Sequence, residues 1–354
     1  MSRKSEEDHL ESTLPVTSRR KNIGVGDLIN GKYKIIDTLD KGGMGQIFLA
    51  EQQTLGRIVA LKVMHAPNDV EAKARFTREA SLAAKLKHPN TVRIFDYGSN
   101  EDGVLFLVME LLEGHPLKGE FSKKPMELGR LIQVGKQVCG ALHEAHSQGL
   151  IHRDIKPNNI FITEHDGAFA KLLDFGLVKN INTKSDISQT GLVLGSPLYM
   201  SPEQVEGKPI DQRSDIYSLG MTLYHAATGQ APYKGELTKI LMAHLVRMPK
   251  TFKELELAHP PLLEWIIFQA IQKEPEQRFQ NILQLKKSLE LLSESLLTNE
   301  KIVLRMEEGK LVTAQGGAID IDSLSQTSFQ FKKEPISASE QTATLVQAEV
   351  EAAE

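Results

Sequence analysis

One short stretch of the sequence constrains this chain more than any other. It reads His-Arg-Asp-Ile-Lys-Pro-Asn-Asn over residues 152–159, and Asp-Phe-Gly follows at residues 174–176. Asp154 can accept a proton from an attacking hydroxyl group, while the amide oxygen of Asn159 and the carboxylate of Asp174 are hard ligands suited to Mg²⁺ on a triphosphate. Two short strands, expected at residues 159–163 and 169–174, carry these groups to one edge. The spacing therefore predicts a phosphoryl-transfer site.

Two features nearer the N-terminus fit the same chemistry. Glycines at positions 42, 43 and 45 lie between two expected strands, where backbone amides can approach a phosphate closely, although a plain hairpin turn is the alternative. Lys62 lies in an otherwise apolar strand, and burying its ammonium group without a partner is costly. Glu79, on the next expected helix, is a candidate partner. The alternative for Lys62 is a surface position on an edge strand.

Composition and charge exclude several classes of protein. The chain has 354 residues, 40% hydrophobic and 25% charged, as in ordinary globular domains. A net charge of −4 argues against nonspecific binding to nucleic acid or anionic membranes. The single cysteine, Cys139, excludes an intrachain disulfide and a zinc site built from cysteines. The polar N-terminus lacks a signal sequence, and no apolar stretch approaches the ~20 residues of a spanning helix. We therefore expect a cytoplasmic protein without a membrane span.

The hydrophobic pattern changes near Gly114. Before it, alternating runs predict strands at residues 33–39, 46–52, 57–64, 91–98 and 104–111, with an amphipathic helix at 69–87. After it, longer patterns predict helices at residues 126–148, 214–228, 261–271 and 281–297. This is an α+β layout of two lobes, a small β-rich N-lobe (33–112) and a larger helical C-lobe (113–295). We expect a flexible N-terminal segment over residues 1–30 and a flexible acidic tail over 296–354.

Taken together, these residues resemble the protein kinase family, and specifically the eukaryotic-like (Hanks-type) serine/threonine protein kinases of bacteria. The strings KGGMGQIFLA, HRDIKPNNIFI and GSPLYMSPEQ carry the resemblance, which covers about residues 33–295. It implies the two-lobed protein kinase fold and transfer of the γ-phosphoryl group of ATP to Ser or Thr of proteins, with Mg²⁺ or Mn²⁺. Lys156, two residues after Asp154, matches the Ser/Thr pattern, since tyrosine kinases usually differ there.

The resemblance also implies a role for individual residues. Lys62 would contact the α- and β-phosphates and pair with Glu79, Asp154 would be the catalytic base, and Lys156 would steady the γ-phosphate. Asn159 and Asp174 would bind the metal. The nucleotide would be enclosed by Leu39, Asp40, Lys41, Gly42, Gly43, Met44, Gly45, Gln46, Ile47, Ala60, Lys62, Met109, Glu110, Leu112 and Phe161. Ordinary core packing is the alternative for the apolar members of this set.

Asp40 departs from the family pattern because it stands where the first glycine of G-x-G-x-x-G is expected. Two like charges ~4 Å apart repel by about 1 kcal/mol in water and ~4 kcal/mol at an effective dielectric of 20. We therefore expect weakened ATP binding in an active enzyme. The alternative is a pseudokinase or weakly active signalling scaffold. A kinase of small molecules such as aminoglycosides is disfavoured, because those enzymes generally lack the Ser-Pro-Glu segment and a long activation loop.

Further residues have structural roles in the family. Ser201-Pro202-Glu203 takes the place of Ala-Pro-Glu, and Glu203 would pair with Arg278. Asp215 would brace the catalytic loop, although it could also be an acidic residue favoured by a helix N-terminus.

The expected activation loop runs from Asp174 to Glu203. Ser188 and Thr190 within it match positions that bacterial relatives autophosphorylate. We expect phosphorylation in trans by a transient homodimer, with the phosphate bound by Arg75, Arg153 and Lys179. The alternative is that these hydroxyl groups lie on an exposed loop and have no regulatory role.

The tail offers a second set of possible phosphorylation sites. Phosphorylated Thr342 or Thr344 could bind a phosphopeptide-binding partner, and an inert tail is the alternative.

Overall fold

The computed structural model describes residues 23–42, 45–64, 70–100, 103–163, 169–176, 197–298, 302, 304–307 and 310–313. The chain divides into two units, residues 1–319 and 320–354, and every described residue belongs to the first. Expectations for Gly43, Met44, Lys179, Ser188, Thr190, Thr342 and Thr344 lie outside the described residues.

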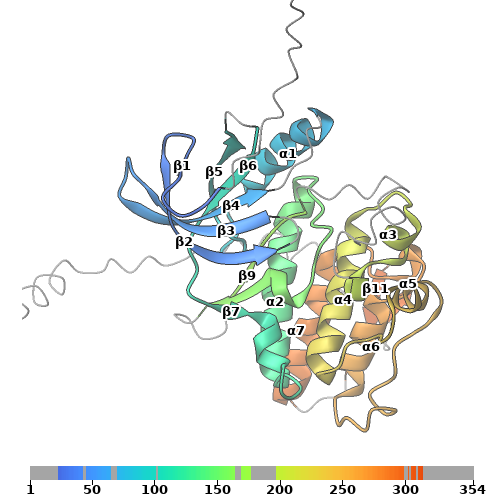
Figure 1. Ribbon diagram of the computed structural model, residues 1–354. Coiled ribbons are helices and arrows are strands. Elements are labelled where there is room, and N and C mark those ends of the chain that lie inside the picture. Colours follow the sequence, from blue (N-terminus) through green and yellow to red (C-terminus); the bar gives the residue numbers. More distant parts are fainter. Residues whose placement is uncertain are drawn as a thin grey trace, which may run out of the picture. The chain divides into compact units, whose positions relative to one another are not determined.

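The N-lobe is built on one antiparallel sheet. Among the described residues it has six strands in the order β1-β2-β3-β4-β6-β5, with helix α1 (Val70–Ala83) beside it (Figure 1). The strands are β1 (Leu28–Ile29), β2 (Tyr33–Gly42), β3 (Gly45–Gln52), β4 (Arg57–Met64), β5 (Ile94–Ser99) and β6 (Leu105–Met109). Alternate residues of these strands form a buried core, which includes Tyr33, Phe48, Leu61 and Phe106. The strands predicted from the alternating pattern are present.

The C-lobe is mainly helical. Its helices are α2 (Leu128–Ser147), α3 (Pro202–Glu206), α4 (Gln212–Thr228), α5 (Leu237–Val246), α6 (Pro261–Ala270) and α7 (Ile282–Thr298). A small sheet contains β7 (Gly114–Pro116), β8 (Ile160–Thr163) and β9 (Phe169–Leu172). Helix α2 packs against α7 and α4, and α4 packs against α6. At this last contact a Cβ on Gly220 would lie 2.7 Å from Ile271, so the helices approach as closely as glycine allows.

The structure corrects both predicted ends of the folded region. Strand β1 lies inside the segment 1–30 that was expected to be flexible, and it pairs with Tyr33 and Lys34 because Ile29 belongs to the core of the sheet. In the predicted tail, α7 continues to Thr298, and β10 (Leu304–Glu307) pairs with β11 (Lys310–Thr313). Leu304 and Val312 of this hairpin are buried. Local apolar residues therefore fold where the average composition of the segment is polar and acidic.

The segment between α1 and β5 ties the two lobes together. The carboxylate of Glu144, on α2, accepts the backbone N–H groups of Lys87 at 2.9 Å and His88 at 2.8 Å. The side chain of Asn90 donates to the carbonyl of Ala170 at 2.7 Å, and the N–H of Val92 donates to the carbonyl of Leu172 at 3.0 Å. These bonds join residues far apart in sequence, so they fix the base of the N-lobe sheet against β9.

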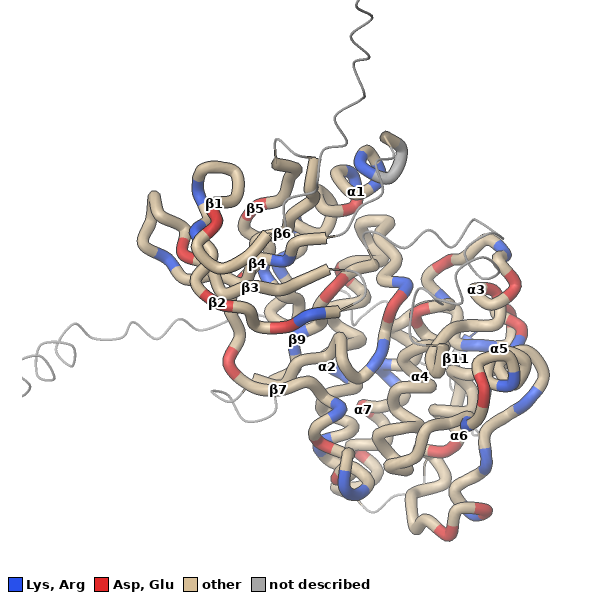
Figure 2. The backbone as a smooth tube through the Cα atoms, in the orientation of Figure 1, with Lys and Arg blue, Asp and Glu red and all other residues tan. Residues whose placement is uncertain are grey.

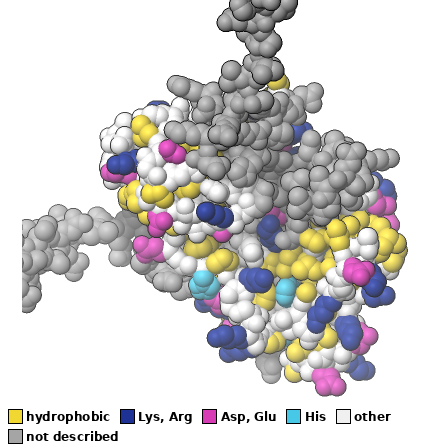
Figure 3. All heavy atoms as spheres, viewed as in Figure 1, with side chains coloured by type: hydrophobic (Ala, Val, Ile, Leu, Met, Phe, Trp, Pro, Cys, Tyr) yellow, Lys and Arg dark blue, Asp and Glu magenta, His cyan; other side chains and the backbone are white. Residues whose placement is uncertain are grey.

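Charged residues of both signs are interspersed along the described chain (Figure 2). Apolar side chains gather on one part of the surface of the helical lobe (Figure 3). Helix α5 exposes 55% of Met242 and 76% of Val246, while its Ile240, Ala243 and His244 are buried.

None of the helices in the described part of the chain is long and apolar enough to cross a lipid bilayer.

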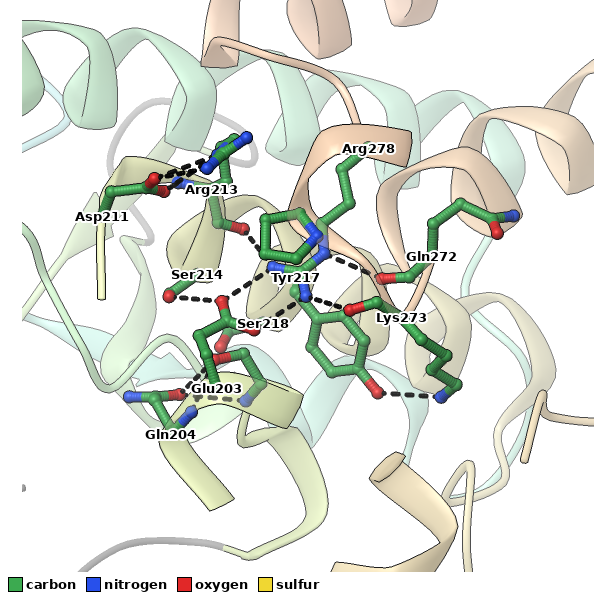
Figure 4. A network of polar contacts seen from close by, with 12 residues as sticks. Glu203, Gln204, Asp211, Arg213, Ser214, Tyr217, Ser218, Gln272, Lys273 and Arg278 are labelled. Carbon is green, nitrogen blue, oxygen red and sulfur yellow. Dashed lines mark hydrogen bonds and ion pairs between the residues drawn. The ribbon is translucent and has the colours of Figure 1, made fainter. Parts of the chain in front are cut away.

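A buried ion pair joins α3 to the segment before α7 (Figure 4). Arg278 is fully buried, and its two terminal nitrogens each donate to one carboxylate oxygen of Glu203 at 2.8 Å. The remaining N–H groups of the guanidinium donate to the carbonyls of Gln272, Lys273 and Arg213 at 2.8 to 3.1 Å. All five donors of the guanidinium are therefore satisfied. Burial alone would raise the pKa of Glu203, but the hydrogen bonds and charge of Arg278 lower it.

We expect Arg278→Ala and Glu203→Ala each to lower the free energy of unfolding by about 3 to 5 kcal/mol, because each leaves a buried charge without its partner. The double variant should lose less than the sum of the two single losses. A double-mutant cycle in urea measures this coupling. As a control, Lys208→Ala removes an exposed ion pair with Glu206 and should change stability little. Additive losses for the buried pair would contradict this interpretation.

Candidate active site

Asp215 holds the catalytic loop, the segment between α2 and β8. Its carboxylate is fully buried and accepts the backbone N–H groups of His152 and Arg153, each at 2.8 Å. The ring of His146, on α2, donates to the same carboxylate at 2.8 Å. Burial alone would raise the pKa of Asp215, but the hydrogen bond and charge of His146 lower it. Asp215 also lies in the first turn of α4, so both roles expected from the sequence describe its position.

Asp154, Lys156 and Asn159 form one hydrogen-bonded group. The ammonium nitrogen Nζ of Lys156 lies 2.9 Å from Oδ2 of Asp154, and Nδ2 of Asn159 donates to the same oxygen at 3.0 Å. Asn159 also donates to the backbone carbonyl of Asp154 at 2.8 Å. These bonds orient the carboxylate. They also turn the amide nitrogen of Asn159 toward Asp154, so its oxygen, the atom that a hard cation binds, lies on the opposite side of the amide group.

The segment 174–176 meets the catalytic loop through His152. The N–H of Gly176 donates to the carbonyl of His152 at 2.9 Å, and the ring of His152 donates to the carbonyl of Leu173 at 2.7 Å. Burial lowers the pKa of His152, which favours the neutral form of the ring. The Phe175 ring packs 4.7 Å from the His152 ring. Asp174 between these contacts has a left-handed φ of 50°, which is uncommon for a residue with a side chain.

The charged pairs differ from the pairing that the sequence predicts. Lys62 lies on β4, and its Nζ is 2.7 Å from Oδ1 of Asp174. Glu79, on α1, is bound instead by the guanidinium of Arg153 at 2.6 Å. The described residues therefore contain no Lys62–Glu79 ion pair, and that expectation is wrong for this conformation. The physical reason is that Arg153 and Asp174, both with left-handed φ, present opposite charges to Glu79 and Lys62 across the lobes. Residue spacing cannot show this.

Part of the predicted adenine site is a separate apolar cluster. Ala60 and Met109 are buried together with Val92, and Ile47, Leu112 and Leu173 pack against them. Leu39 is 48% exposed, and Phe161 is half-buried on β8, outside this cluster. The backbone N–H of Glu110 donates to the carbonyl of Arg93, and its side chain binds Lys171 at 2.7 Å.

Val92 and Leu173 also contribute to this cluster, and neither is among the residues predicted for the site. Each is next to a recognised feature: Leu173 precedes Asp174, and Val92 lies in the predicted strand 91–98. The alternating pattern identifies them as apolar without assigning them to the site, because only the folded chain brings the residues before β5 and after β9 to Ala60 and Met109.

The glycine-rich loop joins β2 to β3. Its described ends pair Gly42 with Gly45 and Asp40 with Ile47. A Cβ on Gly45 would lie 2.1 Å from the carbonyl oxygen of Val63, so only glycine fits against β4 there. The carboxylate of Asp40 is exposed and accepts the N–H of Lys41 at 2.8 Å. Lys41 and Gln46 pair next to these glycines, as β-hairpin neighbours.

Comparisons with known proteins agree with this geometry. A family model described as the protein kinase domain matches residues 33–301. The chain is 38% identical over 265 residues to serine/threonine-protein kinase pkn3 of Myxococcus xanthus, covering 72% of this chain and 48% of that protein. It is 35% identical over 294 residues to serine/threonine-protein kinase PrkC of Bacillus subtilis, covering 82% of this chain and 45% of that protein.

A third relative is the DNA damage-responsive serine/threonine-protein kinase RqkA of Deinococcus radiodurans, which is 35% identical over 260 residues, with 72% of this chain and 39% of that protein covered. The chain thus spans less than half the length of these curated relatives. The family model covers most of the chain, and the structure has the β-rich and helical lobes that the motifs predict. The chain belongs to the protein kinase family.

Proposed function

We propose that this chain is an active serine/threonine protein kinase, a signalling enzyme that transfers the γ-phosphoryl group of ATP to Ser or Thr side chains of proteins. The observation that carries the proposal is the contact between Lys62 and Asp174 at 2.7 Å. It joins the strand lysine of the N-lobe to the Asp-Phe-Gly segment of the C-lobe, beside the group formed by Asp154, Lys156 and Asn159. The names of the relatives, all serine/threonine-protein kinases, support the same activity.

Each polar group of the site has a role in this reaction. Asp154 accepts the proton of the substrate hydroxyl, and the bonds from Lys156 and Asn159 hold its carboxylate in one orientation. Lys156 then steadies the γ-phosphate, and Lys62 binds the α- and β-phosphates. The cluster around Ala60 and Met109 supplies an apolar surface for adenine, with backbone groups of Glu110 and Leu112 beside it. Asp40 lies towards the ribose, and repulsion between its carboxylate and the anionic nucleotide weakens ATP binding.

The donor set fits a divalent cation. Asn159 and Asp174 provide one amide oxygen and one carboxylate, and Mg²⁺ in nucleotide sites binds one or two such groups together with substrate phosphates. We propose Mg²⁺ as the natural metal and Mn²⁺ as a substitute. Asn159 and Asp174 would hold the metal, which would supply positive charge to neutralise the phosphates, and Lys62 contacts Asp174 beside this site at 2.7 Å.

Two features bear on the competing readings. The chain has every residue that the reaction is expected to need: Lys62, Glu79, Asp154, Asn159 and Asp174. Only Asp40 favours a pseudokinase or scaffold. Lys156 supports Ser/Thr rather than Tyr as the acceptor. We also propose a cytoplasmic location, because the reaction draws on ATP, and partners that are protein substrates carrying Ser or Thr.

Asp154→Asn tests the activity directly. With labelled ATP, Mg²⁺ and an exogenous protein substrate, we expect the turnover rate of the variant to be about 10²- to 10⁴-fold lower than that of the wild type. This factor is the usual contribution of a general base. Binding of a nonhydrolysable ATP analogue should be retained, because Asp154 contacts the hydroxyl. Asp211→Asn, which alters an exposed capping carboxylate of α4, is the control and should keep activity. Phosphoamino-acid analysis separates Ser/Thr from Tyr. A wild-type protein without turnover would favour the pseudokinase.

We further propose that phosphorylation of the activation loop switches the enzyme on. In the described conformation Arg153 is bound to Glu79, so the carboxylate of Glu79 is occupied. A phosphate on Thr190, with Ser188 as helper, offers Arg153 a stronger anion with up to ~2 negative charges and three acceptor oxygens. Arg153 would exchange partners, and Glu79 would become free to pair with Lys62. Arg75 and Lys179 would complete the phosphate pocket.

The double variant Ser188→Ala, Thr190→Ala tests this switch. We expect it to stay about tenfold or more below the wild type after incubation with ATP, since one charge-assisted hydrogen bond contributes ~1.5 to 3 kcal/mol. The rate of wild-type activation should rise with enzyme concentration, as phosphorylation in trans requires. The matched control is Thr183→Ala, Ser185→Ala in the same loop, which should activate normally. Full activity of the first variant towards an exogenous substrate would contradict the switch.

A further inference from the structure

Gln204 is a buried polar side chain to which the reaction above assigns no role. It follows Glu203 on α3, is only 3% exposed, and points away from the Glu203–Arg278 pair (Figure 4). Its amide oxygen closes a capping box with Ser201: the Ser201 N–H donates to Oε1 at 3.0 Å, and the Gln204 N–H donates to Oγ of Ser201 at 3.4 Å. Because the oxygen is held by the start of α3, the amide nitrogen is directed to the other side.

That nitrogen reaches the catalytic loop. Nε2 of Gln204 donates to the backbone carbonyl of Arg153 at 3.0 Å. The N–H of the same residue donates to Asp215 at 2.8 Å, so the backbone of Arg153 is held on both sides. Arg153 has a left-handed φ of 65°, a conformation that residues with a Cβ rarely adopt without support. The carbonyl that Gln204 binds belongs to the peptide bond leading directly to Asp154.

We propose that Gln204 is a positioning residue for the catalytic base: it fixes the Arg153–Asp154 peptide and so sets where the Asp154 carboxylate lies. The inference rests on the proposed kinase activity. It also links α3, where the expected activation loop ends, to the peptide bond that leads to the base. Capping of α3 alone would require the Gln204 oxygen and not the nitrogen, and the nitrogen is the atom that contacts Arg153.

Gln204→Glu separates these two roles. A capping box accepts Glu as readily as Gln, so the acceptor for Ser201 is kept, whereas the donor to Arg153 is lost and an oxygen faces the carbonyl. We expect kcat to fall about tenfold to hundredfold, as small displacements of a reacting group produce, while the KM for ATP changes little. Ser201→Ala is the matched control, because it weakens the cap and leaves the Gln204 nitrogen in place. It should lower the unfolding temperature and keep kcat.

A second measurement tests whether the effect passes through the base. In the Asp154→Asn background the base is already lost, so adding Gln204→Glu should change the residual turnover little. An unchanged kcat in Gln204→Glu would overturn the proposal. So would an equal kcat loss in Ser201→Ala, or an undiminished effect of Gln204→Glu in the Asp154→Asn background, since each would indicate a purely structural role. Failure of the kinase proposal is distinguishable, because it appears as absence of turnover in the wild type.

Discussion

The catalytic half of this structure depends on one buried carboxylate. Asp215 is fully buried, and its two oxygens hold the ring of His146 and the backbone N–H groups of His152 and Arg153. An ionised carboxylate without such donors would be strongly destabilised in the interior, and hydrogen bonds to a charged acceptor are stronger than neutral ones. The same bonds therefore keep Asp215 charged and keep the catalytic loop in a conformation that the backbone would not otherwise adopt.

The rest of the site extends from this support. His152 is held by Asp215 through its backbone and contacts the Asp-Phe-Gly segment through its ring and carbonyl. Arg153 is held by Asp215 and Gln204 through its backbone, which leaves its guanidinium to reach Glu79. One anion on α4 thus positions two residues, His152 and Arg153, that contact the Asp-Phe-Gly segment and Glu79 of α1. The buried Glu203–Arg278 pair stabilises α3 next to the same loop. It therefore helps to hold in place the helix that carries Gln204.

Much of the fold was predictable, and the reasons are local. Alternating apolar residues predict β2, β3, β4 and β6, and longer periodic patterns predict α2, α4, α6 and α7, because these elements bury one face. Short elements escaped prediction. Helix α5 carries apolar residues on both its buried and its exposed sides, and β10 and β11 lie in a segment of polar average composition. In both, few residues carry the signal, and tertiary packing decides the outcome.

What the sequence by itself determined is the chemistry: which residues can accept a proton, bind a metal or contact a phosphate, and to which family the chain belongs. These follow from residue types at fixed spacing, since a carboxylate has the same chemistry wherever it is brought. Only the tertiary structure decided the partners. Lys62 is paired with Asp174, Glu79 with Arg153, and Gln204 with the backbone carbonyl of Arg153. Ion pairs and buried hydrogen bonds form between groups that folding brings within about 3 Å, and that proximity depends on how two lobes and several loops pack, which no local pattern encodes.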